Sequence, residues 1–253
     1  MFVDSHVHLN SPEFGADLPE VLTRARAAGV HRFLCPGTDL ASSRAAAALA
    51  RSEASVLGAV GVHPHDARTW DVATAAEIES LLAANPALAV GETGLDYFYD
   101  HSPRDVQQRV LRWHLHMAQR YDRPIVVHNR DSDADMASIL AAEGTGLRLV
   151  LHAFGGSTVL AEVGARSGFY FGIGGFLTFK KHPLAECVRD LPQQALLLET
   201  DAPYLSPHPY RGQRNEPAHV AIVARRLGEL LGLDVDAVAR LTTQNFARFV
   251  GSV

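Results

Sequence analysis

The sequence has few cysteines and no long apolar run, and both absences narrow the class of protein. Its 253 residues include only two cysteines, Cys35 and Cys187, which is too few for a disulfide framework and indicates a reducing compartment. No stretch of about 18 apolar residues is present, which excludes a transmembrane helix. The opening residues MFVDSHVHLN lack the basic segment and the apolar core of a signal peptide. We therefore expect a cytoplasmic protein with no membrane partner.

The chain also lacks an excess of basic residues. Lys and Arg together number 23 against 28 Asp and Glu, which gives a formal net charge of −5. This balance argues against a protein that wraps duplex DNA through counterion release alone, but one locally positive cleft is enough for a nucleic-acid substrate. Only Lys180 and Lys181 are lysines, so arginine supplies nearly all of the positive charge.

Short apolar runs alternate regularly with stretches of helical periodicity, in a composition of 47% hydrophobic and 20% charged residues that is typical of globular domains. The expected strands are Phe2–His8, Val30–Cys35, Val56–Val62, Ala89–Glu92, Ile125–His128, Leu147–His152, Phe169–Ile173 and Ala195–Glu199. The expected helices include Leu18–Ala28, Leu40–Glu53, Ala75–Ala84, Val106–Tyr121, Ser132–Glu143, Ala218–Leu231 and Val235–Phe249.

Eight such alternations, with strands apolar on both faces, favour a closed parallel (β/α)8 barrel of the TIM type. A doubly wound open sheet is the competing interpretation, because alternation alone does not decide closure. No linker or internal repeat interrupts the pattern, so the sequence predicts a single α/β domain over residues 1–253.

Two histidines of the first expected strand, His6 and His8, are separated by one residue. Side chains at i and i+2 of a strand point to the same face, so both imidazoles can approach one cation. Four further candidate ligands stand at the ends of later strands: Glu92, His128, His152 and Asp201. In a closed barrel these ends converge on one rim, where active sites of this fold form. A shared cation would also offset the cost of burying so many ionisable groups.

These six donors suit two divalent ions better than one. Imidazoles and carboxylates are typical ligands of Zn²⁺, Mn²⁺ or Fe²⁺, while Mg²⁺ prefers more oxygen, and six donors are too many for one tetrahedral catalytic ion with an open position. We therefore expect two ions (Zn, Mn or Mg) bridged by a carboxylate and a water. Glu92 is the expected bridge. The first ion is assigned His6, His8 and Asp201, and the second His128 and His152.

Several motifs together resemble those of the TatD family of metal-dependent deoxyribonucleases, which belongs to the amidohydrolase-type barrels: DSHVHL, GVHPHD, GETGLDYF, VVHNR, LHAFGG, ETDAPYL and RNEP. They run from Asp4 to Pro217 and cover nearly the whole chain. The resemblance implies the same six metal ligands and cleavage of DNA phosphodiester bonds, typically from the 3′ end of single strands. LHAFGG departs from the family, because relatives commonly carry a Cys and a Ser around the Phe, but His152 is retained.

The charges of the expected site favour a phosphate substrate only when metal is bound. Glu92 and Asp201 are both acidic, so the metal-free site would repel a phosphodiester, and two divalent ions would invert that sign. A metal can lower the pKa of bound water to about 7, and we expect the resulting hydroxide to attack phosphorus in line. Asp201 is expected to serve either as a general base or as a plain ligand.

Further residues are candidates for substrate binding. His63, in GVHPHD, resembles a family residue near the substrate phosphate, where a protonated imidazole could donate a hydrogen bond. Arg211 and Arg214, in YRGQRNEP, can bind the DNA backbone through their guanidinium groups. Asn215 either shares this contact or caps the following helix.

Aromatic residues after the fourth and eighth strands are less specific candidates. Tyr97, Phe98 and Tyr204 either stack on bases or are exposed aromatics of the rim. His65 is interpreted as a loop-packing histidine. Asp4 is expected to orient a ligand histidine or to be a buried structural carboxylate.

The leading interpretation is a two-metal phosphodiesterase that acts on DNA as a monomer. An amide or lactone hydrolase on the same barrel is the alternative. Many amidohydrolases bridge their metals with a carboxylated lysine at the end of strand 4, but this chain has Glu92 there. A non-catalytic metal or phosphate binder is the third possibility, although purely structural sites tend to be closed.

Overall fold

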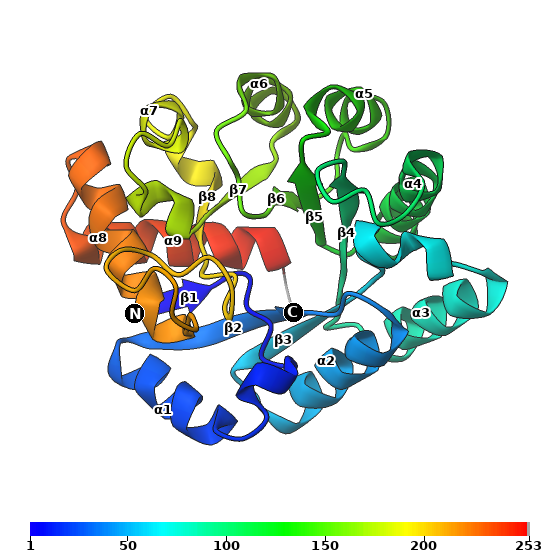
Figure 1. Ribbon diagram of the computed structural model, residues 1–253, viewed down its shortest axis with the longest axis horizontal. Coiled ribbons are helices and arrows are strands. Elements are labelled where there is room, and N and C mark those ends of the chain that lie inside the picture. The colour runs from blue at the N-terminus through cyan, green and yellow to red at the C-terminus, as the bar shows by residue number, and fades with distance from the viewer. Residues whose placement is uncertain (252–253) are drawn as a thin grey trace.

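Eight parallel strands follow one another in sequence order around a ring (Figure 1). The computed structural model describes residues 1–251. The strands are β1 (Phe2–Asp4), β2 (Val30–Pro36), β3 (Val56–Val60), β4 (Ala89–Asp96), β5 (Ile125–Arg130), β6 (Leu149–Leu151), β7 (Tyr170–Ile173) and β8 (Leu196–Leu198). The backbone N–H of Ser5 donates to the carbonyl of Leu198 (2.9 Å), which joins the end of β1 to β8. The ring is therefore nearly closed. This confirms the predicted barrel and excludes the doubly wound sheet.

The helices lie outside the ring of strands, around it or, for α9, across one of its ends (Figure 1). They are α1 (Leu18–Ala27), α2 (Leu40–Ser52), α3 (Val72–Ala84), α4 (Arg104–Tyr121), α5 (Asp133–Glu143), α6 (Thr158–Ser167), α7 (Leu184–Cys187), α8 (Val220–Leu231) and α9 (Val235–Val250). Five short 3₁₀ turns complete the described elements: η1 (Pro12–Phe14), η2 (Pro64–Thr69), η3 (Gly175–Thr178), η4 (Gln193–Ala195) and η5 (Pro217–His219). None of the helices within residues 1–251 has the length and apolarity that crossing a membrane requires.

The helix starts follow from polar capping side chains. Asp39, Asp71 and Asp234 each accept a hydrogen bond from a backbone N–H in the first turn of α2, α3 and α9 respectively. The cap at Asp71 explains why α3 begins at Val72, three residues before the predicted Ala75.

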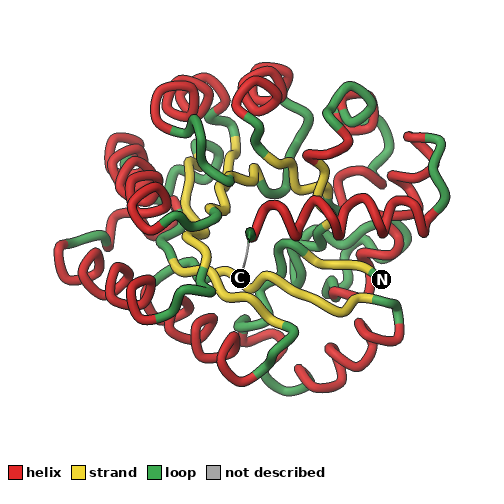
Figure 2. Tube along the Cα trace, turned by 180° about the vertical axis from the view of Figure 1, so that it is seen from behind, coloured by secondary structure: helices red, strands yellow, loops and turns green. Residues whose placement is uncertain are grey.

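Helix α9 closes one end of the barrel. Figure 2 shows it running across the ring of strands as seen from behind. Its Phe246, Phe249 and Val250 pack against inward-facing strand residues such as Val126 and Leu197 in one buried cluster. This apolar plug leaves only the other end of the barrel, where the strands have their carboxyl ends, for a polar site.

Two strands differ from their predicted lengths in ways that matter for the site. Regular pairing of β1 ends at Asp4, so His6 and His8 lie just beyond the strand. Strand β4 does not end at Glu92, because its residues Thr93–Asp96 pair with Val127–Arg130 of β5. The longer β4 and β5 carry additional side chains up to the open rim.

Candidate metal centre

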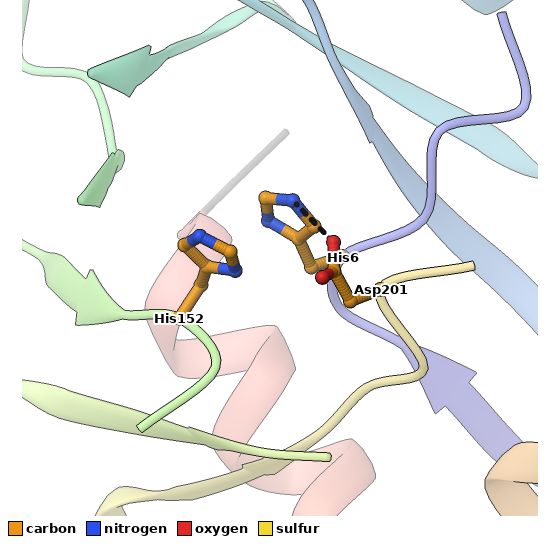
Figure 3. A group of neighbouring side chains, drawn as sticks. All are labelled: His6, His152 and Asp201. Atoms are coloured by element: carbon orange, nitrogen blue, oxygen red, sulfur yellow. Dashed lines mark ion pairs between the residues drawn. The ribbon is translucent and has the colours of Figure 1, made fainter. Parts of the chain in front are cut away.

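All six predicted ligands meet at the open end of the barrel. His6 and His8 follow β1, Glu92 lies in β4, His128 lies in β5, and His152 and Asp201 follow β6 and β8. Three groups drawn from these residues and His63 have ligand atoms within 4.8 Å of one another. Figure 3 shows how the His6 ring lies between His152 and Asp201, which come from opposite sides of the view.

The first half of the cluster surrounds Oε2 of Glu92. Nε2 of His6 lies 3.3 Å from this oxygen and 3.3 Å from Nε2 of His8. Oδ1 of Asp201 lies 3.6 Å from Nε2 of His6 and 3.3 Å from Nε2 of His8. Ligands bound tetrahedrally at about 2.1 Å are about 3.4 Å apart, so the spacing of these four atoms fits a single cation between them.

The second half surrounds Oε1 of the same carboxylate. This oxygen lies 3.3 Å from Nδ1 of His128 and 2.8 Å from Nε2 of His152, and the two nitrogens lie 3.1 Å apart. Glu92 is buried, with 2% of the residue exposed, and its side chain faces a different set of imidazoles with each oxygen. Such a carboxylate has the geometry of a bridge between two cations.

The histidines of the cluster keep its two acidic side chains ionised. Burial disfavours ionisation of Glu92, but the neighbouring histidines, His152 and His6 first, hold the pKa of its carboxyl well below the ordinary value. Burial also opposes ionisation of Asp201, and His8 and His6 outweigh it, so that this pKa too is lowered. Both side chains are therefore carboxylates at neutral pH, the form that binds a metal.

His63 also lies in the cluster, as a hydrogen-bond donor. Its Nδ1 accepts from the backbone N–H of His65 (3.2 Å), so the proton of the neutral ring is on Nε2, which lies 3.4 Å from Oε1 of Glu92. Burial lowers the pKa of His63 to about 4. In its neutral form the ring directs the Nε2–H group into the site.

Sequence reasoning missed two carboxylates behind the ligand histidines. Oδ2 of Asp96 lies 3.3 Å from Nε2 of His128 and 2.9 Å from Nε2 of His65, so His65 has a partner beyond loop packing. Glu199 places Oε1 3.7 Å from Nδ1 of His152 and accepts from the backbone N–H of Ala153 (2.5 Å). Carboxylates in such places orient ligand histidines in metal sites. Asp96 is detectable in GETGLD, because residues 92 and 96 face the same side of an extended strand.

Asp4 is a buried structural carboxylate. It accepts hydrogen bonds from the hydroxyl of Thr200 (2.6 Å) and from the backbone N–H groups of Thr200 (2.9 Å) and His6 (3.3 Å). These bonds fix the backbone that carries His6 at the junction of the first and last strands.

The predicted DNA contacts after β8 have other partners. Both terminal nitrogens of Arg214 bind the carboxylate of Asp17 (2.8 and 2.7 Å), and one also binds Glu216 (3.0 Å). Asn215 is completely buried and donates to the carbonyls of Thr200 (2.9 Å) and Tyr204 (2.6 Å). This burial contradicts direct contact between Asn215 and DNA.

Asn215 is also not a helix cap, because the residue that precedes η5 is Glu216. The residue that precedes α8 is His219, whose Nδ1 pairs with Oδ1 of Asn215 (2.8 Å). Arg211 lies with its guanidinium carbon 3.9 Å from the centre of the Phe179 ring, outside the walls of the pocket described next.

A cavity of about 990 Å³ opens above the cluster. Its walls include the predicted ligands His8 and Asp201, together with Tyr99 and Tyr204 from the rim loops and Arg130 from the end of β5. Of the aromatic candidates, Phe98 (55%) and Tyr204 (54%) are exposed, whereas Tyr97 is partly buried and donates its hydroxyl to Asp135 (2.8 Å). The cavity is large enough for a substrate of several rings beside the cluster.

Comparisons with known proteins agree with this architecture. A family model described as TatD related DNase matches residues 3–251. A Bacillus subtilis protein named uncharacterized metal-dependent hydrolase YabD is 39% identical over 98% of each chain. An Escherichia fergusonii protein named 3'-5' ssDNA/RNA exonuclease TatD is 34% identical, again over 98% of each. The crystal structure of the TatD homologue YJJV from Escherichia coli K12 superposes with a TM-score of 0.93 at 32% identity, covering 98% of this chain and 97% of that one.

The fold and these matches define the class of protein, a metal-dependent hydrolase built on a (β/α)8 barrel. Within that class, the chain belongs to the TatD family.

Proposed function

We propose that this protein is a two-metal nuclease that removes nucleotides from the 3′ end of single-stranded DNA. The observation that carries the proposal is the Glu92 carboxylate, whose Oε2 faces His6 and His8 and whose Oε1 faces His128 and His152 beside His63. Two metals that share a carboxylate form a clamp suited to in-line displacement at phosphorus. The relative named as an exonuclease supports the choice of a nucleic-acid substrate.

In this proposal His6, His8 and Asp201 would hold the first ion and His128 and His152 the second, with Glu92 available to both. The spacing of 3.3 to 3.6 Å between Nε2 of His6 and the other atoms of the first half supports this division. Bound divalent ions supply Lewis acidity toward phosphate oxygens and lower the pKa of water.

Two side chains act directly on the reacting groups. Asp201 is anionic and 9% exposed at the cavity wall, so it can accept a proton from the attacking water. His63 donates its Nε2 proton to a non-bridging phosphate oxygen, and its neutral ring keeps this donor through the neutral pH range.

The alternative, an amide or lactone hydrolase, commonly has a carboxylated lysine as the bridge at the end of strand 4. The two lysines of the chain lie between η3 and α7, whereas the bridge position in β4 is occupied by Glu92. The Glu92 bridge therefore favours the phosphodiesterase.

The test uses the full chain with a 5′-labelled single-stranded DNA, the matching RNA, a circular single-stranded DNA without ends, and a panel of esters, lactones and amides. With Mn²⁺ or Mg²⁺ we expect the linear DNA to shorten progressively from its 3′ end. The circular DNA should remain intact, and EDTA should stop the reaction. Cleavage of the circle would overturn the exonuclease assignment. No phosphodiester cleavage with any of Zn²⁺, Mn²⁺ or Mg²⁺ would overturn the nuclease.

A further inference from the structure

One face of strand β5 leads from the barrel core through the metal centre to the rim. Val126 is buried in the barrel interior, His128 belongs to the candidate metal centre, and Arg130 ends the strand at the cavity wall. Alternate residues of a strand share a face, and two residues span about 6.5 Å. Arg130 therefore lies one step beyond a metal ligand, on the same face.

The Arg130 side chain is positioned by aromatic rings. Its guanidinium carbon lies 4.1 Å from the centre of the Phe98 ring and 4.7 Å from that of Tyr99. Both rings are about half exposed, at 55% and 49%. Stacking of this kind holds the guanidinium plane without using its N–H donors, which remain available to an anion.

Arg130 is the only lysine or arginine in the cavity wall as far as residues 1–251 show. Its guanidinium has no carboxylate partner among them, whereas Arg214 and Arg104 are both ion-paired. Several carboxylates line the same cavity, including Asp66, Asp131 and Asp133. In such surroundings, one unpaired cation beside the metal centre marks the place where a second negative charge of the substrate can be accommodated.

We propose that Arg130, held against Phe98 and Tyr99, binds the phosphate next to the scissile one in a nucleic-acid strand. Arg130 is the next residue after His128 on this face of β5, and both line the cavity. This inference rests on the proposed nuclease function, and it adds a second phosphate subsite to it. A guanidinium can form two parallel hydrogen bonds with phosphate oxygens, which fixes the strand relative to the metals.

The test compares Arg130→Gln with the wild type on a single-stranded DNA and on bis(4-nitrophenyl) phosphate, which has only one phosphate. We expect KM for DNA to rise about 10- to 100-fold, because a charge-assisted hydrogen bond is lost. The value of kcat should change less than about twofold. The plot of log KM against log salt should flatten by about 0.7, which corresponds to one phosphate contact on a single strand. Turnover of the one-phosphate substrate should not change.

Arg104→Gln is the matched control. Arg104 also lies over an aromatic ring, 4.3 Å from the centre of Tyr97, but it pairs with Asp100 (3.2 Å) and does not line the cavity. Its KM and salt dependence should equal those of the wild type. Arg130→Lys keeps the charge and loses the fork, so its KM should lie between those of wild type and Arg130→Gln.

Two kinds of failure can be told apart. If the wild type cleaves DNA and Arg130→Gln does so with the same KM and salt slope, the second subsite is overturned and the nuclease stands. Equal losses on both substrates would assign Arg130 to the scissile phosphate and also overturn the proposal. If the wild type cleaves no nucleic acid, the proposed function fails. The subsite is then judged by fluorescence anisotropy of labelled DNA, where equal dissociation constants for wild type and Arg130→Gln would overturn it.

Discussion

The two sides of the barrel mouth hold their histidines by different means. On the side of β1 and β8, backbone hydrogen bonds place His6 and His8: the N–H of His8 donates to Ala202 (2.8 Å), and that of Asp201 donates to His6 (2.9 Å). On the side of β4 to β6, the side chain of Asp96 holds the outer nitrogen of His128 (3.3 Å). The first arrangement depends on closure of the barrel, whereas the orientation of His128 depends on a carboxylate that mutation can remove.

The arginines of the two sides differ in the same way. Arg214, on the side of β8, is occupied by Asp17 and Glu216, whereas the guanidinium of Arg130, at the end of β5, lies over the Phe98 and Tyr99 rings and has no carboxylate partner within residues 1–251. The position of Arg214 in the motif therefore does not leave its guanidinium free, because neighbouring carboxylates occupy it.

Glu92 faces histidines on both sides of the barrel mouth, so its replacement should impair both halves of the cluster. We expect Glu92→Gln to lower kcat by about 1,000-fold or more, because neither metal keeps its shared anionic ligand. Metal analysis of the purified variant should show fewer ions per chain than the wild type. Asp66→Asn, which changes another carboxylate of the cavity wall, is the control and should retain activity and metal content. Near-normal turnover by Glu92→Gln, with an unchanged circular dichroism spectrum, would refute the bridge.

Asp96→Asn should affect only the side of β4 to β6, where Asp96 contacts His128. Oδ1 of Asp96 accepts from the backbone N–H groups of Phe98 (3.0 Å) and Tyr99 (2.8 Å), and the amide oxygen of Asn can replace it. The change therefore falls mainly on Oδ2, which faces His128. We expect one of the two metals to bind about 10- to 100-fold more weakly and the other to keep its affinity. Calorimetric metal titration measures both.

The exposed Asp135 provides the control for this prediction. It lies on the same rim and binds the hydroxyl of Tyr97 (2.8 Å) without contact to a ligand histidine. Asp135→Asn should leave both affinities unchanged. Equal weakening of both metals by Asp96→Asn would show that the two sides are not independent.

Much of this architecture is encoded locally and could be predicted from sequence. Buried parallel strands give apolar runs, and polar residues directly after those runs must lie at one rim once the barrel closes. That logic placed His128 and His152 correctly beside Glu92. It missed the residues that follow in the same strands, because β4 and β5 were expected to end at Glu92 and His128. The extensions bring Asp96 and Arg130 to the rim, and they arise from pairing between the two strands, which a single sequence does not display.

Tertiary pairing explains the opposite error. Arg214 and its partner Asp17 are 197 residues apart, and Asn215 is buried under a loop whose carbonyls it binds. Motif reasoning identified residues that are able to bind phosphate. Whether they are free to do so depends on side chains that only the folded chain brings near.

Arg214→Gln should have the smallest effect, and it contrasts the two arginines directly. We expect KM for single-stranded DNA to stay within about twofold of wild type, since the Arg214 side chain is already occupied. The melting temperature should fall by about 1 to 3 °C, because partly exposed ion pairs contribute little.

The hydrogen bond from Arg214 lowers the pKa of Asp17 from 3.8 to about 2. A carboxyl whose pKa is lowered on folding stabilises the protein above its ordinary pKa, and this contribution is lost as the pH falls through the folded value. The difference in melting temperature should therefore be constant between about pH 5 and 7 and should shrink as the pH approaches 2. Thermal scans of both proteins across this range measure it, with Asp17→Asn as the reciprocal variant. A rise in KM for Arg214→Gln, combined with an unchanged KM for Arg130→Gln, would reverse the roles assigned to the two sides of the mouth.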